Sequence, residues 1–488
     1  MTRPPFGFGP SDRPGEPGGE DDPFGLAAMF GGAGGPLGGM GPGGMGPGGM
    51  GEVFGQLQKL MSWTGGPVNW DLADEVATSA TRADDVPVTA EQAREVVEAC
   101  RLADLWLDPA TSFPGSGAQA QAWTRTGWVA ATTPAWKQLV DPVAAQVVTA
   151  MSGALEQGVA GGLSQDLPPE VSSMLAAAGG PGALRGVMAQ VGGFVFGAQV
   201  GQALGALAKE VLSSSEVGLP LSPPGRPALV PANLAAFSAG LEVPADEVRL
   251  YVALRELAHQ RLFASVPWLR SHLFDVVEAY ARGIQVDGSA IAEAVGSIDP
   301  SDPASMQRAM GEGLFDIEPT PAQKAALARL ETALALVEGW VDAVVDAAAS
   351  GTLPSAAALR ETIRRRRATG GPAEQTFATL VGLELRPRRL REAAALWAAV
   401  AAQGGTAARD ALWAHPDLLP SAQDLDDPTG FVTRTGAGGG QPEVSAVDWD
   451  AGLRDLDKDL DGDLYGDAAG PSDPSDEGPA EPGDDRPG

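Results

Sequence analysis

The stretch LRELAHQRLF, residues 254–263, contains three side chains whose types and spacing point to chemistry: Arg255, Glu256 and His259. A zinc peptidase helix places two histidines four residues apart, so that both bind one Zn²⁺ ion. The glutamate after the first histidine is the general base on the zinc-bound water. In this chain Glu256 has the position of the base and His259 that of the second ligand. Arg255 stands at the position of the first ligand, where a guanidinium stays protonated and cannot bind a cation.

The helix that must carry this motif is expected at residues 246–263, and Pro267 ends it before a second helix, WLRSHLFDVVEAYA. Both faces of the first helix are largely apolar, so we expect it to be buried. A buried glutamate or histidine needs polar partners. The pattern E-x-x-H alone is common in helices, but two of the three histidines, His259 and His272, lie in this segment.

Helical spacing of apolar residues recurs along most of the chain and predicts a mainly α-helical fold with a few short strands. Examples are TAEQAREVVEACRLADLWL, PAQKAALARLETALALVEGWVDAVVDAAA and RRLREAAALWAAVAAQ. Thr89 and Gln92 resemble a capping box at the start of the first of these. Alternating strand patterns are nearly absent, although PALVPANLAAF could include a short extended piece.

Composition divides the chain into three parts. Residues 1–66 form an arm rich in Gly, Pro and Met, residues 67–435 a folded helical domain, and residues 436–488 an acidic tail. The arm is predicted to be disordered because its glycines and prolines do not hold a helix or strand, and the tail because it is low in apolar residues. In the tail, DKDLDGDLYGDA (457–468) matches the first half of a calcium loop. Ala468 stands where such a loop needs a bidentate carboxylate, so a solvated acidic segment is favoured.

The bulk composition limits the class of function. A net charge of −30 argues against nucleic acid and against anionic membranes as partners. The single cysteine, Cys100, excludes a disulfide framework. The first residues have no apolar run typical of a signal peptide, so we expect a cytoplasmic protein.

Residues 186–208 form an uncharged helix in which Gly193, Gly197, Gly201 and Gly205 make one smooth stripe. Such a stripe suits close helix packing, in a membrane or in a folded domain. Three glutamines in the segment favour the folded domain and make a membrane span the alternative.

The four arginines 364–367 spread around a helix, which favours a solvated face. They could pair with acidic neighbours or with the tail, and a site for phosphate or an acidic partner is a further alternative. Tryptophans 123, 128, 136 and 397 are expected in the core, and His415 in a loop.

Several longer phrases together resemble the actinobacterial zincin-like metallopeptidase type 2 family. They are GAQVGQALGALAKEVL, PANLAAF, LRELAHQRLFASVPWLRSHL, LVEGWVDAVV and RRRRATGGPAEQTFATLVGLELRPRRLREAAALW, within roughly residues 70–430. The resemblance implies a zincin-like helical domain and the activity of a hydrolase or zinc-dependent metalloprotease. A related branch is associated with coenzyme F420 biosynthesis genes.

The resemblance also implies site residues. In the branch with the complete motif, one helix carries HExxH and a later helix carries a phrase similar to E-G-H that supplies the third ligand. The matching positions make Glu256 the general base and His259 and Glu338 the surviving zinc ligands. Arg255 and Trp340 depart from the pattern.

Two other residues compete for the place of the third ligand. Glu278 follows His259 after eighteen intervening residues, a spacing that some zinc peptidases use, and His272 lies on the same second helix.

Two hypotheses follow for the function. The first is a zinc-dependent hydrolase that acts on a peptide or protein substrate. In one form of this hypothesis the metal is bound by a rearranged site of His259, His272 and a carboxylate. The second is a non-catalytic scaffold in which Arg255 replaces the metal ion as a structural cation paired with Glu256 and Glu338. Its arm and acidic tail would then recruit protein partners. A membrane-associated protein is a third possibility.

Overall fold

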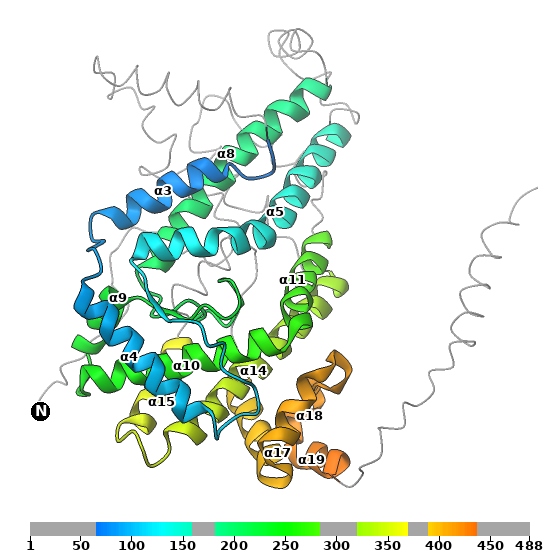
Figure 1. Cartoon of the computed structure of the whole chain (residues 1–488). Helices are drawn as coiled ribbons and strands as arrows, with labels where there is room; N and C mark the ends of the chain where they lie inside the picture. The colour runs from blue at the N-terminus through cyan, green and yellow to red at the C-terminus, as the bar shows by residue number, and fades with distance from the viewer. Residues whose placement is uncertain (1–64, 159–180, 284–319, 369–388, 437–488) are drawn as a thin grey trace, which may run out of the picture. The chain divides into compact units, whose positions relative to one another are not determined.

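The computed structural model describes residues 65–158, 181–283, 320–368 and 389–436 (Figure 1). Nearly all of the predicted arm and tail, including the calcium-like loop, lies outside the described residues.

The described residues are mainly α-helical, as predicted. The helices are α3 (Trp70–Arg82), α4 (Ala90–Leu107), α5 (Arg125–Gly158), α8 (Pro181–Ala208), α9 (Pro231–Ala239), α10 (Ala245–Ser265), α11 (Pro267–Arg282), α14 (Pro321–Ala349), α15 (Ala356–Ala368), α17 (Leu390–Ala411), α18 (Ala422–Asp426) and α19 (Pro428–Gly436), with short 3-10 helices at Leu412–Ala414 and Pro416–Leu418. Strands β1 (Gln121–Ala122) and β2 (Ala228–Leu229) pair in parallel. The extended piece expected within PALVPANLAAF is therefore present as β2.

Local signals in the sequence fix several helix ends. The Thr89 hydroxyl accepts a hydrogen bond from the Gln92 backbone, and the Gln92 side chain accepts one from the Thr89 backbone, which completes the predicted capping box. Thr320 and Gln323 form the same arrangement before α14. Pro267 opens α11, where its missing N–H costs nothing.

Helix α3 packs against the glycine stripe of α8 (Figure 1). A Cβ atom built on Gly197 would lie 2.5 Å from the Asn69 carbonyl oxygen, and one on Gly201 would lie 2.6 Å from the Ala73 carbonyl oxygen. Only glycine permits this approach of two helix backbones, so the close-packing interpretation is confirmed. Among the described helices, none is long and apolar enough to cross a membrane.

Helix α10 lies at the centre of the core and contacts α4, α9 and α14. Every side chain from Leu250 to Phe263 is buried, as are those from Ala333 to Asp342 on α14. Helix α15 lies against both α10 and α14. The predicted motif residues and Glu338 are thus held inside the core by two neighbouring helices.

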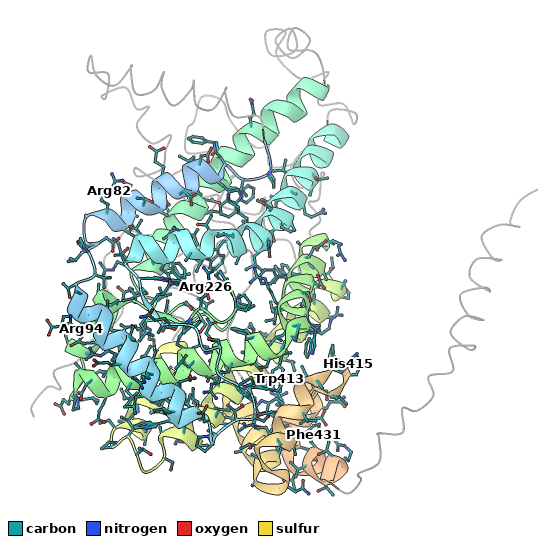
Figure 2. The ribbon with its side chains drawn as sticks, viewed as in Figure 1. Arg82, Arg94, Arg226, Trp413, His415 and Phe431 are labelled. Atoms are coloured by element: carbon teal, nitrogen blue, oxygen red, sulfur yellow. The ribbon has the colours of Figure 1, made fainter. Side chains whose placement is uncertain are left out.

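The predicted core tryptophans are buried, with Trp128, Trp136 and Trp397 fully so and Trp123 partly. The ring of Trp413 stacks on Trp397. His415 follows Trp413 in the chain and is largely exposed, as expected of a loop residue (Figure 2).

Candidate functional site

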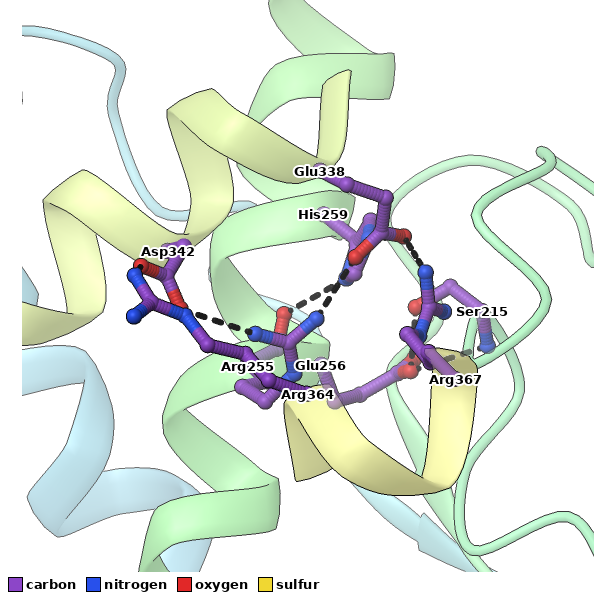
Figure 3. Close-up of polar contacts among 8 residues, drawn as sticks. All are labelled: Ser215, Arg255, Glu256, His259, Glu338, Asp342, Arg364 and Arg367. Carbon is purple, nitrogen blue, oxygen red and sulfur yellow. Dashed lines mark hydrogen bonds and ion pairs between the residues drawn. The ribbon is translucent and has the colours of Figure 1, made fainter. Parts of the chain in front are cut away.

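The carboxylate of Glu338 is the centre of a buried ion cluster formed by three helices (Figure 3). Its Oε2 accepts a hydrogen bond from Arg255 Nη2 at 2.6 Å. Its Oε1 lies 2.9 Å from His259 Nε2 and 2.7 Å from Arg367 Nη1. The backbone of Gly218 passes so close that a Cβ there would lie 2.6 Å from Oε1, and its φ of +82° also favours glycine. The carboxylate is only 1% exposed.

The ring of His259 lies between two oxygen atoms. Nδ1 is 2.9 Å from the Arg255 carbonyl oxygen, and Nε2 faces Glu338. A carbonyl oxygen and an ionised carboxylate can only accept hydrogen bonds. Each ring nitrogen therefore faces an acceptor, and a nitrogen that carries a proton donates to it.

The charges around Glu338 decide its ionisation. Burial alone would raise the pKa of this carboxyl group, but Arg367, His259 and Arg255 together hold the pKa well below its usual range. Burial alone would likewise lower the pKa of Arg255, but Glu338, with smaller effects of Tyr251 and Asp342, raises it above its usual value. Both shifts keep the Glu338–Arg255 pair ionised at neutral pH.

Arg255 also connects Glu338 with the next carboxylate along α14. Its Nη1 lies 4.0 Å from Asp342 Oδ1, while Arg364 Nη2 approaches Asp342 Oδ2 to 2.5 Å. Asp342 is 3% exposed, so it too is a buried carboxylate that needs cations.

Glu256 lies in a separate environment made of neutral donors. Its carboxylate accepts hydrogen bonds from the Ser214 and Ser215 hydroxyls, both at 2.5 Å, and from the Ser215 backbone N–H at 3.0 Å. The Ala228 N–H at 3.3 Å and the Gln260 side-chain amide at 3.0 Å complete the set. These donors occupy the lone pairs of the carboxylate, so it has no free position from which to activate a water molecule.

The prediction that Arg255 pairs with both Glu256 and Glu338 is therefore wrong for Glu256. Successive residues of a helix do not face each other. Arg255 consequently points to α14, while Glu256 points to the loop that precedes β2. The sequence did not predict the donors to Glu256, which are Ser214, Ser215 and Gln260. The serines lie about forty residues before Glu256, and no sequence pattern links them to it.

The other predicted ligands lie outside the ion cluster. The ring of His272 packs edge-on against Trp268. Glu278 pairs with Arg282 one turn later on the exposed surface of α11. Trp340, the second departure from the family pattern, donates a hydrogen bond from Nε1 to Asp410 at 2.9 Å. Of the predicted ligands, the structure brings together only His259 and Glu338.

These residues do not form a suitable site for Zn²⁺. Zinc in proteins takes three or four His, Cys or carboxylate ligands. Within the described ranges, no group of three such residues gathers. Arg255 and Arg367 also occupy the oxygens of Glu338 and place positive charge where the ion would bind. The chemistry of the donor set therefore favours a guanidinium over a metal ion.

Comparisons with known proteins agree with this architecture. The crystal structure of a Chloroflexus aurantiacus protein, described as "a putative hydrolase with a novel fold", has the same fold. The TM-score is 0.52 at 20% sequence identity, and the match covers 76% of this chain and 100% of that one. No curated protein matches this sequence. The profile of a family described as zincin-like metallopeptidase matches residues 68–432. The chain therefore belongs to the zincin-like metallopeptidase family.

Proposed function

We propose that this protein is a non-catalytic, zincin-like scaffold in which the guanidinium groups of Arg255 and Arg367 replace the metal ion. The observation that carries the proposal is that both oxygens of the Glu338 carboxylate are paired with these two arginines and His259. Glu256, the base expected from the motif, is likewise fully hydrogen-bonded. The role of such a scaffold is to bind other proteins, and the arm and acidic tail are the segments proposed to recruit them.

The second candidate is a hydrolase of peptides or proteins that still uses zinc. It is supported by the family membership and by the description of the Chloroflexus aurantiacus protein. The 2.9 Å contact between His259 and Glu338 also favours it, because these two side chains could become ligands if the arginines moved away.

Elemental analysis separates the two candidates. The protein should be purified without a metal-affinity tag, supplied with zinc and dialysed, next to a His259→Ala variant. The double variant Arg255→His/Arg367→Ala restores the first histidine of the motif and removes the second cation, so it tests whether the assay detects zinc in this fold.

We expect no stoichiometric zinc in the parent and a gain of zinc in the double variant. Stoichiometric zinc in the parent that is lost in His259→Ala would contradict the scaffold function. Peptidase assays with the parent would then be the next step.

A further inference from the structure

The outer face of helix α4 carries two exposed leucines next to each other. Leu102 and Leu105 are three positions apart and so are neighbours on the helix surface, and their exposed fractions are 40% and 61%. Among the described residues, Val86 is the only other large apolar side chain that is exposed. Single exposed apolar residues are common, whereas a pair on one helix face forms a small apolar patch.

Helix α4 turns its opposite face to the core. The buried residues of this helix are Val96, Cys100, Ala103 and Leu107. Helix α10 is the principal neighbour of that face (Figure 1). The leucine pair lies on the other side, and nothing in the described parts of the chain covers it.

Opposite charges stand at the two ends of the leucine pair. Arg101 precedes it, and no carboxylate of the described residues pairs with this guanidinium. Asp108 follows the pair, keeps helical backbone angles and is 65% exposed. Arg261 pairs with both Asp104 and Asp108, so one guanidinium serves two carboxylates and a net negative charge remains there. Arg101 and Asp108 are two helical turns apart and so lie on the same flank of the patch.

We propose that a second copy of this chain docks on the outer face of α4, with the two α4 helices antiparallel about a two-fold axis. The axis passes between Leu102 and Leu105, so each of them meets the other leucine of the second copy. The reversed helix direction also brings Arg101 to Asp108 of the second copy, twice by symmetry. The argument for a second copy is this self-complementarity of charge. The inference goes beyond the proposed function and holds whether or not zinc binds near Glu338.

The dimer should be weak and reversible, because the patch is small. Stable interfaces bury about 800 Å² per partner, and this one centres on two leucines from each copy. Association is therefore expected in the micromolar range. Two chains of net charge −30 repel each other at low ionic strength, so it should be measured at about 0.15 M salt, where the Debye length is about 8 Å.

Sedimentation velocity of the full chain over a micromolar concentration series measures the association. The parent should change from monomer to dimer as its concentration rises. Leu102→Asp/Leu105→Asp should weaken the dimer at least about thirtyfold, the effect of losing a contact of hot-spot strength. Val86→Asp is the matched control and should leave the dimer unchanged, because Val86 is 66% exposed but lies before the first turn of α4.

A charge exchange tests the antiparallel pairing itself. Arg101→Asp alone and Asp108→Arg alone each place like charges opposite each other and should dissociate the dimer. Mixed together, the two variants should form a mixed dimer, because each reversed charge then meets its opposite. Fluorescence-detected sedimentation of labelled Arg101→Asp with unlabelled Asp108→Arg measures this, and unlabelled Arg101→Asp in its place is the control.

A parent that stays monomeric throughout the series would overturn the inference, as would a dimer that survives the two leucine substitutions. Failure of the folded charge variants to associate when mixed would equally refute the pairing. Thermal unfolding checks that each variant is folded. The leucine variant and Arg101→Asp leave the pairs of Arg261 untouched, so they test the proposal even if Asp108→Arg does not fold.

Discussion

Replacing Arg255 with alanine is the most direct test of the buried ion cluster. The side chain is 10% exposed and lies between two carboxylates that are almost fully buried, Glu338 and Asp342. Removing one partner of a buried ion pair costs about 3–5 kcal/mol, because the charge that remains loses its compensation. In this cluster Glu338 keeps Arg367 and His259, and Asp342 keeps Arg364. We therefore expect Arg255→Ala to lower the free energy of unfolding by about 3 kcal/mol, the lower end of that range.

Glu338 should be the more sensitive position of the same cluster. Glu338→Ala leaves Arg255, Arg367 and His259 close together without the carboxylate that compensates them. We expect this variant to lose about 5 kcal/mol, the upper end of the range for a broken buried pair. Arg255→Lys should fall between the parent and Arg255→Ala, because a lysine keeps the charge but not the planar set of donors.

Urea unfolding measures these differences, since the transition midpoint shifts with stability when the slope is unchanged. Arg282→Ala is the control, because Arg282 pairs with Glu278 at the surface and such pairs contribute about 0–1 kcal/mol. If Arg255→Ala unfolds at the same urea concentration as the parent, the guanidinium does not compensate the buried carboxylates and the reasoning fails.

Three further outcomes can be measured on the same chain. The pKa of Glu338 is lowered in the folded state, so its ionised form stabilises the fold above the ordinary carboxyl pKa of 4.5, and this stabilisation is lost as the pH falls below that value. The urea midpoint of Glu338→Gln, which has no carboxylate to protonate, should therefore fall less steeply below pH 4.5 than that of the parent. Gly201→Ala should lower the free energy of unfolding by about 1–3 kcal/mol, because the added methyl group overpacks against α3. Gly186→Ala, which has open space on the same helix, should raise it by up to about 1 kcal/mol. Thermal unfolding of both variants checks the sign of each change. Trp340→Phe leaves Asp410 without one buried donor and should cost about 1–3 kcal/mol in urea unfolding, and no measurable loss would contradict that role of the indole N–H.

Local features of the sequence predicted the helices well. The helix expected at residues 246–263 is observed as Ala245–Ser265, and the expected break at Pro267 begins the next helix. Capping residues, prolines and apolar spacing act over a few residues, so they can be recognised without knowing the fold. The approach of His259 to Glu338 was predicted only from the family resemblance. The two residues are 79 positions apart, so no local pattern links them.

The partners of the buried carboxylates could not be predicted in the same way. Nothing in the local sequence indicates that Ser214 and Ser215 meet Glu256. For the arginines at 364–367, the solvated face was favoured over the alternative of pairing with acidic neighbours. Arg364, Arg366 and Arg367 in fact contact carboxylates of other elements. One signal was nevertheless present: acidic residues at four-residue intervals on one predicted helix, followed within a few residues by arginines at helical spacing on the next.

The hydrogen bonds around Glu256 also bear on how the chain folds. This carboxylate cannot enter the core at low cost until the loop with Ser214 and Ser215 supplies its donors. The loop in turn gains these bonds only when α10 is in place. The two segments should therefore dock in one cooperative step, and amide hydrogens in both should exchange through the same opening event at a similar rate.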